Sequence, residues 1–241
     1  MSGQPWAMLR RLSARTMSEQ LNLTMRSQLL ATLALLTAST ALCLADKAAD
    51  LKPVLNQPGK VVVDEKFAGG ALPSSWGGVQ GDWQVRDGTV VGKEKASDEH
   101  PAVLFLNQPH RDAIVRFSFK LDGAKNFSLS LNHPKGHLFR VAIAEDGLTL
   151  SKDKDKKDPK AKAVQLGKAA GKFEAGKWHT LVMETKGGKV SVQADNGAKV
   201  EGSHPELDVD KTGYRFVIKG ESLRVSDVKV WQAEKATAAA K

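Results

Sequence analysis

The side chains of this sequence that are best suited to bind a polar ligand lie where polar and apolar residues alternate. Arg116, Ser130 and Arg140 each stand between apolar neighbours, and Asn132 follows Leu131 at the end of the same alternation. A β-strand turns alternate residues to opposite faces, so these four side chains should point away from the core. Guanidinium, amide and hydroxyl groups form the hydrogen bonds that sugar hydroxyls and acidic sugars use. The alternative is that they are ordinary solvated positions, as on any sandwich.

The four residues should lie close together if residues 127–132 and 138–144 form a hairpin across the loop from Pro134 to Gly136. The same loop carries His133 and His137, which could hold a metal ion, although no acidic residue is adjacent in sequence. An exposed turn is the alternative for this pair of imidazoles.

Trp76 is a further candidate ligand-binding residue, because it lies in a glycine-rich segment expected to be a loop, residues 68–81. An exposed indole there could stack on a sugar ring, and a buried loop anchor is the alternative. Asp64, Glu65 and Asp227 offer hard oxygen ligands on strands expected to be neighbours, and we name them as candidate ligands of a structural calcium ion.

The N-terminal part of the chain has the pattern of a secretory signal. An apolar run at residues 29–44 follows Arg26 and ends in the small residue Ala45, which predicts cleavage before Asp46. Met25 is a plausible true start, because residues 25–45 have the usual length. A retained membrane anchor is the alternative, but the run falls short of the ~20 apolar residues that a span needs. We therefore expect an exported protein, periplasmic or extracellular, with no membrane contact after cleavage.

The composition excludes several kinds of site. The single cysteine, Cys43, leaves with the signal, so the mature chain has no thiolate metal site and no cysteine nucleophile. The net charge of +9 falls on cleavage, because four arginines leave with one glutamate. The run SKDKDKKDPKAK at residues 151–162 mixes lysine with aspartate, which is typical of a solvated loop rather than an anion-binding surface. We expect no nucleic-acid partner.

The alternation predicts an all-β fold, an antiparallel β-sandwich of the jelly-roll type. Asp87-Gly88 and Gly187-Gly188 are expected hairpin turns. The expected strands are residues 61–67, 82–86, 89–93, 102–106, 113–121, 127–132, 138–144, 148–151, 164–166, 178–185, 189–194, 199–202, 213–219 and 223–231. The expected domains are a signal peptide at 1–45, a linker at 46–59, the jelly roll at 60–232 and a disordered tail at 233–241.

Three short segments resemble known families. The segment GKWHTL at residues 176–181 resembles a strand of laminin-G-like domains, in the superfamily of concanavalin A-like lectins and glucanases. GDWQV at 81–85, followed by Asp87-Gly88, resembles the opening of exported bacterial jelly rolls called family-16-like or grouped with 3-keto-disaccharide hydrolases. SDVKVW at 226–231 resembles their closing strand. The resemblance implies two curved sheets and a concave face that commonly binds sugars.

The sequence departs from these families at the positions that perform catalysis. Family-16 glucanases carry Glu-x-Asp-x-x-Glu on one strand, and the 3-keto-disaccharide hydrolase group carries Asn-Ser-Gly; neither run occurs here. A retaining glycosidase needs two carboxyl groups ~5 Å apart. We therefore expect binding of carbohydrate or glycoconjugate without catalysis. The alternatives are a glycoside hydrolase of the 3-keto-disaccharide hydrolase type and a structural or adhesion module that binds protein.

Overall fold

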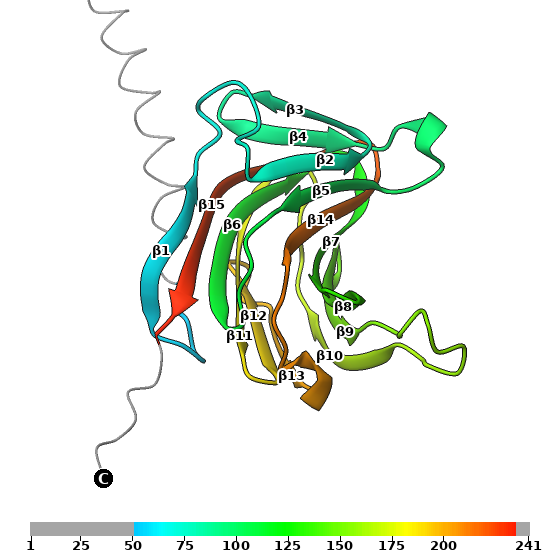
Figure 1. The fold of residues 1–241 in the computed structure, drawn as a ribbon. Coiled ribbons are helices and arrows are strands. Elements are labelled where there is room, and N and C mark those ends of the chain that lie inside the picture. Colours follow the sequence, from blue (N-terminus) through cyan, green and yellow to red (C-terminus); the bar gives the residue numbers. More distant parts are fainter. Residues whose placement is uncertain (1–50, 235–241) are drawn as a thin grey trace, which may run out of the picture. The chain divides into compact units, whose positions relative to one another are not determined.

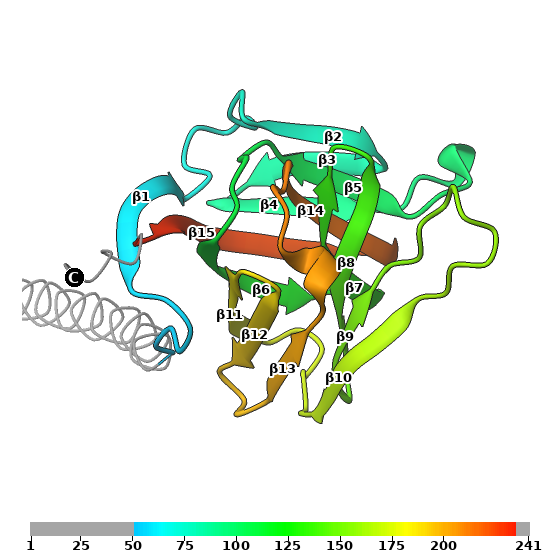
Figure 2. The same cartoon turned by 60° about the horizontal axis from the view of Figure 1, so that its bottom comes forward.

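Two antiparallel β-sheets packed face to face form the domain (Figures 1 and 2). The structure is a computed structural model and describes residues 51–234. The all-β sandwich predicted from the alternation is confirmed. The predicted signal peptide at 1–45 and most of the predicted tail lie outside the described residues. Within 51–234 there is no helix long and apolar enough to cross a membrane.

The first sheet, called sheet A, has the order β13-β12-β11-β6-β15-β4-β3, and β1 pairs with β15 next to β4. Its strands are β1 (Pro58–Glu65), β3 (Asp82–Arg86), β4 (Thr89–Lys93), β6 (Ala113–Leu121), β11 (Trp178–Lys186), β12 (Lys189–Ala194), β13 (Lys199–Ser203) and β15 (Leu223–Ala233).

The second sheet, called sheet B, has the order β10-β9-β8-β7-β14-β5-β2. Its strands are β2 (Trp76–Gln80), β5 (Ala102–Leu106), β7 (Ala124–His133), β8 (Gly136–Ala144), β9 (Gly147–Lys152), β10 (Val164–Ala170) and β14 (Gly213–Gly220). Two short 3₁₀ turns, η1 (Ala96–Asp98) and η2 (Pro205–Leu207), join strands. Strand β2 lies inside the segment expected to be a loop.

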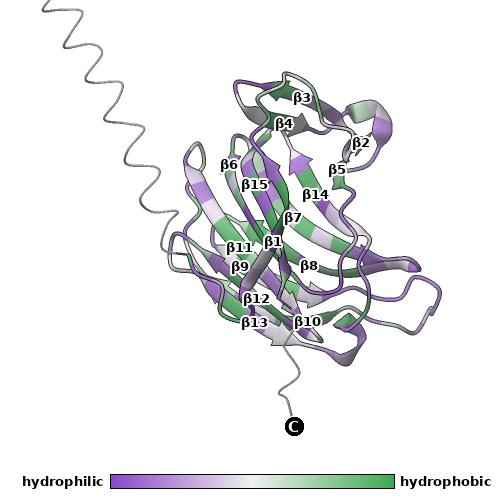
Figure 3. Cartoon of the chain, turned by 60° about the vertical axis from the view of Figure 1, so that its left-hand side comes forward, coloured by the Kyte–Doolittle hydropathy of each residue, from purple (hydrophilic) through white to green (hydrophobic). Residues whose placement is uncertain are grey.

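The core lies between the sheets and is built by the alternating residues (Figure 3). Phe117 on β6 reaches across the sandwich to Phe127 on β7 and Phe216 on β14, with ring centroids 5.9 Å and 5.4 Å apart. All three side chains are fully buried. Burying each contributes ~1.5–3 kcal/mol relative to exposure, so this contact fixes which face of each sheet points inward.

Three hairpins form where the sequence predicted them, and one of them joins β11 to β12 across Gly187-Gly188. Strands β3 and β4 turn at Asp87 and Gly88, whose φ angles are 50° and 69°. Positive φ at both central residues gives the turn whose twist matches that of the strands. Strands β7 and β8 pair as the third hairpin, with Ser130 opposite Arg140.

The expected linker is in part a packed element of the domain. Strand β1 begins at Pro58, three residues before the expected start, and residues 51–57 lie along sheet A. The Glu184 carboxylate, on β11, accepts hydrogen bonds from the backbone N–H groups of Val54, Leu55 and Asn56 at 2.6, 2.9 and 2.9 Å. These bonds explain how a segment without regular structure is held in place.

Candidate functional site

A row of polar side chains crosses the outer face of sheet B. Ser130 on β7 lies opposite Arg140 on β8 and, on its other side, opposite Arg215 on β14. The row continues from Arg140 to Ser151 on β9 and from Arg215 to Phe105 on β5. Residues that are paired in register share a face. Two guanidinium groups therefore flank one hydroxyl group.

Arg140 is held in position by one carboxylate. Its Nε and a terminal nitrogen donate to Oδ1 of Asp153 at 2.8 and 2.6 Å. The Asp153 side chain is 9% exposed, and its other oxygen, Oδ2, is buried without a hydrogen-bond partner. The Arg140 side chain is 44% exposed. The guanidinium of Arg140 is thus fixed in position, while part of it remains open to solvent.

Arg215 faces a neutral partner instead of a carboxylate. Its guanidinium lies 3.3 Å from Nδ1 of His137, and the same Nδ1 lies 3.2 Å from Oδ1 of Asn132. Burial lowers the pKa of His137, and the nearby charge of Arg215 lowers it further. In the tautomer whose Nδ1 carries no proton, the imidazole accepts from Arg215 and makes no hydrogen bond to Oδ1 of Asn132. Burial also lowers the pKa of Arg215, and the charge of Arg140 adds to this effect.

We call these residues the sheet B cluster. Its members are Ser130, Asn132, His137, Arg140, Asp153 and Arg215.

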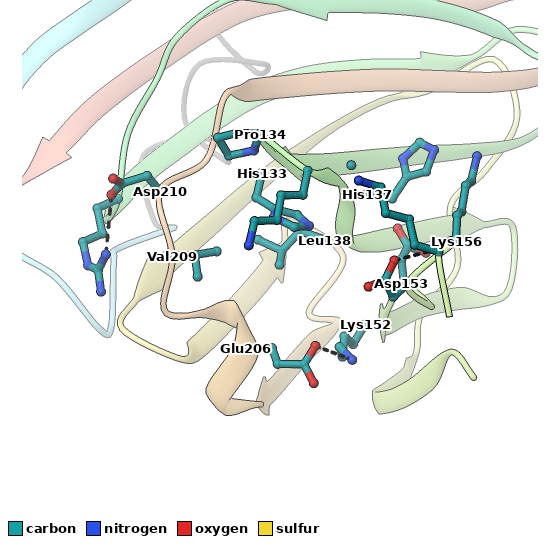
Figure 4. A pocket seen from close by; sticks show the side chains of 15 residues that line it. His133, Pro134, His137, Leu138, Lys152, Asp153, Lys156, Glu206, Val209 and Asp210 are labelled. Carbon is teal, nitrogen blue, oxygen red and sulfur yellow. Dashed lines mark hydrogen bonds and ion pairs between the residues drawn. The ribbon is translucent and has the colours of Figure 1, made fainter. Parts of the chain in front are cut away.

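A pocket of about 600 Å³ adjoins the cluster and shares His137 and Asp153 with it (Figure 4). It lies between the β7–β8 hairpin loop, the charged segment after β9, and the chain that follows η2. Lys152 and Glu206 close one side with an ion pair of 2.6 Å. The segment that the sequence indicated as a solvated loop therefore forms one wall of this pocket.

Arg116 does not lie with the other predicted residues. It is on β6, in sheet A, where it is in register with Val182 and Lys229. The expectation that it lies close to Ser130 is wrong. Strands β6 and β7 follow each other in sequence but belong to different sheets, so the chain crosses the sandwich between them.

Trp76 is not an exposed platform. Its side chain is 6% exposed and packs against Phe67 and Phe216 at centroid distances of 5.2 and 5.6 Å. Strand β2 turns the indole inward, and it belongs to the core. The buried anchor, which was the alternative, is the correct interpretation.

The three candidate calcium ligands are each engaged by other groups. Asp64 forms an ion pair with Lys229 at 2.9 Å, and Asp227 forms one with Lys66 at 2.6 Å. The Glu65 carboxylate accepts from the N–H of Phe67. Across residues 51–234, no three acidic or histidine side chains are grouped as metal ligands. The structure therefore provides no support for the calcium prediction.

Sequence reasoning missed Arg215, Phe105 and Asp153 as parts of the site. Arg215 alternates with apolar residues, and this signal would have placed it on an outer face. Phe105 lies in a wholly apolar strand, where no alternation marks its face. The position of Arg215 beside Ser130, and of Phe105 beside Arg215, follows only from the strand order. Asp153 opens the charged run, and no local signal marks it as the partner of Arg140.

Comparison with known proteins identifies the fold. No family model matches the sequence, and no curated protein matches it. Among solved structures, a non-specific endo-β-1,3(4)-glucanase from family GH16 is 14% identical with a TM-score of 0.52, covering 74% of this chain and 95% of that one. The CBM2 module of the Lactobacillus casei BL23 phage J-1 evolved Dit is 12% identical with a TM-score of 0.51, covering 76% and 100%.

A sialidase is also similar, at 10% identity and a TM-score of 0.54 over 73% of this chain. This chain spans 19% of the sialidase's length. The domain has the jelly-roll β-sandwich fold of these structures. This fold is shared by carbohydrate-binding modules and glycoside hydrolases, and identities this low establish the fold alone.

Proposed function

We propose that this domain binds a saccharide on the outer face of sheet B, at the sheet B cluster. The observation that carries the proposal is the row in which Arg140 and Arg215 flank Ser130. These side chains present several donors at fixed positions, because Asp153 and His137 hold the two guanidinium groups. Preorganised donors lose little side-chain entropy on binding, which favours recognition of sugar hydroxyl groups.

We propose that the domain binds without catalysis. The outward positions of β8 are Arg140, Ala142 and Ala144, and those of β7 are Ser128, Ser130 and Asn132. None of these positions carries a carboxylate. Asp153 is the acidic member of the cluster and is already bound to Arg140. A pair of carboxyl groups with glycosidase spacing is therefore lacking among these positions of the described face.

The segments that resemble family-16-like and 3-keto-disaccharide hydrolase domains lie in β3 and β15 of sheet A. They support a saccharide as the ligand and do not select a face. The leader pattern supports a further element of the proposal, that the ligand is met in the periplasm or outside the cell.

A glycan array, run with and without calcium, tests the proposal. Arg140→Lys is the test variant, because it retains a positive charge beside the buried Asp153 and removes the planar guanidinium group. We expect a hit to lose ~1–3 kcal/mol of binding free energy in this variant. Arg116→Lys is the matched control on the outer face of sheet A and should bind as the parent does.

Two results would contradict the proposal: equal loss in both variants, or an array without any hit. Incubation of the hits with the protein, followed by analysis for smaller sugars, separates binding from hydrolysis. Released products would favour the glycoside hydrolase alternative.

A further inference from the structure

The sheet B cluster has more positive than negative charge. Arg140 and Arg215 lie on either side of Ser130, and Asp153 is the only carboxylate among the cluster residues. That carboxylate is bound to Arg140. Within residues 51–234, Arg215 has no carboxylate within ion-pair distance, and its polar neighbour is the neutral His137. One half-buried guanidinium therefore has no ion-pair partner, and the negative charge that acts on it is that of Asp153, which is already bound to Arg140.

The adjoining pocket is lined by five cationic side chains and four carboxylates, so its excess of positive charge is small. Lys152 and Arg111 in its walls are paired with Glu206 and with Asp208 and Asp210. Lys135, Lys156 and Lys157 also line the pocket, and the described part of the chain offers none of them an ion pair. The charge of Lys156 also contributes to the lowered pKa of His137, which places it electrostatically close to the cluster.

An apolar surface lies at the other end of the row. Phe105 is directly opposite Arg215 on the neighbouring strand and is partly exposed. An aromatic face suits the C–H surface of a sugar ring, while a planar guanidinium suits a carboxylate through two parallel hydrogen bonds. Adjacent strands are ~4.8 Å apart, so a single sugar can reach both groups.

We propose that the ligand of this face is an acidic saccharide, whose carboxylate is bound between Arg140 and Arg215 above Ser130. The proposal rests on the proposed function and names the class of sugar. The ring packs against Phe105, and the next units of an oligosaccharide extend toward the lysines of the pocket. A uronic acid has this combination of a pyranose ring and a planar carboxylate. A neutral sugar would leave Arg215 without an ion pair of its own.

Isothermal titration calorimetry with matched ligands tests the proposal. The probes are tetramers of galacturonic, glucuronic and mannuronic acid, each beside the neutral tetramer of galactose, glucose or mannose. At least one acidic tetramer should bind about tenfold or more tightly than its neutral counterpart, as expected for a hydrogen bond to a charged group. The preference should shrink as salt is raised from 50 mM to 500 mM, because ions screen the exposed part of the attraction.

Variants locate the charge effect. Arg215→Gln should abolish the preference for the acidic tetramer, and Arg215→Lys should retain part of it, because the charge remains and the fork is lost. Arg116→Gln removes one arginine from the outer face of sheet A and should leave the preference unchanged. Thermal unfolding of each variant shows whether it is folded. If Arg215→Gln does not fold, Arg215→Lys still tests the inference.

The inference is overturned if no acidic tetramer binds more tightly than its neutral counterpart, or if Arg215→Gln and Arg116→Gln reduce the preference equally. In either case, the proposed function still stands if a neutral tetramer binds and Arg140→Lys weakens that binding. A sulfated galactose tetramer that binds more tightly than every uronic acid tetramer overturns the assignment of a carboxylate. Absence of binding by all tetramers overturns both proposals.

Discussion

The Glu184 carboxylate provides the most direct test of how the N-terminal segment is attached. Its side chain is 1% exposed and has no cation as its partner; instead it accepts three backbone N–H bonds from Val54, Leu55 and Asn56. Oε2 accepts two of them and Oε1 accepts the third. Substitution of Glu184 therefore acts on the attachment of residues 51–57 to sheet A.

The expected magnitude is smaller than the sum of the bonds. Hydrogen bonds to a charged group contribute ~1.5–3 kcal/mol each, so three would give ~4.5–9 kcal/mol. When Glu184→Ala removes the acceptor, however, residues 51–57 can detach, and their N–H groups regain water. The freed backbone also recovers ~1–2 kcal/mol of entropy per residue. We expect a net loss of about 2–4 kcal/mol in the free energy of unfolding.

Glu184→Gln should have a smaller effect. An amide oxygen in the place of Oε2 keeps two of the three bonds, while the amide nitrogen faces the N–H of Val54. A loss of about 1–2 kcal/mol follows from one missing acceptor. Glu201→Ala is the control, because this exposed carboxylate has one ion pair, to Lys199, and surface pairs contribute ~0–1 kcal/mol.

Urea denaturation at pH 7 measures these differences, and limited proteolysis measures release of the segment. Cleavage within residues 51–57 should accelerate in Glu184→Ala before the domain unfolds. The reasoning is refuted if Glu184→Ala costs less than about 0.5 kcal/mol, or if its N-terminal segment resists protease as the parent does.

Two further predictions concern buried aromatic groups. Trp76→Ala should lower the free energy of unfolding by ~3–5 kcal/mol, since it empties a core position against Phe67 and Phe216; an unchanged urea midpoint with lost sugar binding would contradict its place in the core. Burial lowers the pKa of His110 from 6.5 to about 4. Between pH 6.5 and pH 4 the protein therefore takes up a proton when it unfolds. The resulting stability is fully present above pH 6.5 and is lost as the pH falls toward 4, by ~3 kcal/mol in all. Urea denaturation of His110→Phe at pH 7 and pH 5 should show a smaller decrease than the parent, and an equal decrease would exclude His110 as the source.

The strands and hairpins could be predicted because their signals are local. Alternation places Phe127 and Phe139 inward whichever strands they pair with, and Asp87-Gly88 forms its turn through its own backbone preferences. The pairing of Ser130 with Arg140 followed from the same reasoning, since the hairpin loop fixes the register between two successive strands.

Which residues make up the site depends on pairing between strands that are far apart in the sequence. Alternation within one strand carries no information about that pairing. Arg116 and Arg215 look alike in sequence, each on the polar side of an alternating strand. Ser130 on β7 and Arg215 on β14 are 85 residues apart in the sequence, and only the order of the strands in sheet B brings them together. Strand β6, in contrast, belongs to the opposite sheet. The burial of Trp76 likewise depends on β2 pairing with β5, a contact that no pattern near the tryptophan reveals.

The arrangement of the two arginines is costly for the fold and is therefore informative about function. Like charges brought together on one sheet face destabilise it, and removing a guanidinium from water adds to that cost. Two other arginines of the domain are neutralised: Arg224 pairs with Asp122, and Arg111 with Asp208. Arg116 and Arg86 have no ion pair within residues 51–234, but neither lies beside a second arginine in register. Arg215 lacks such a partner in the described chain. The carboxylate of a ligand bound above Ser130 would supply one. Proteins break such local rules mainly at functional sites, which favours a ligand that brings the missing negative charge.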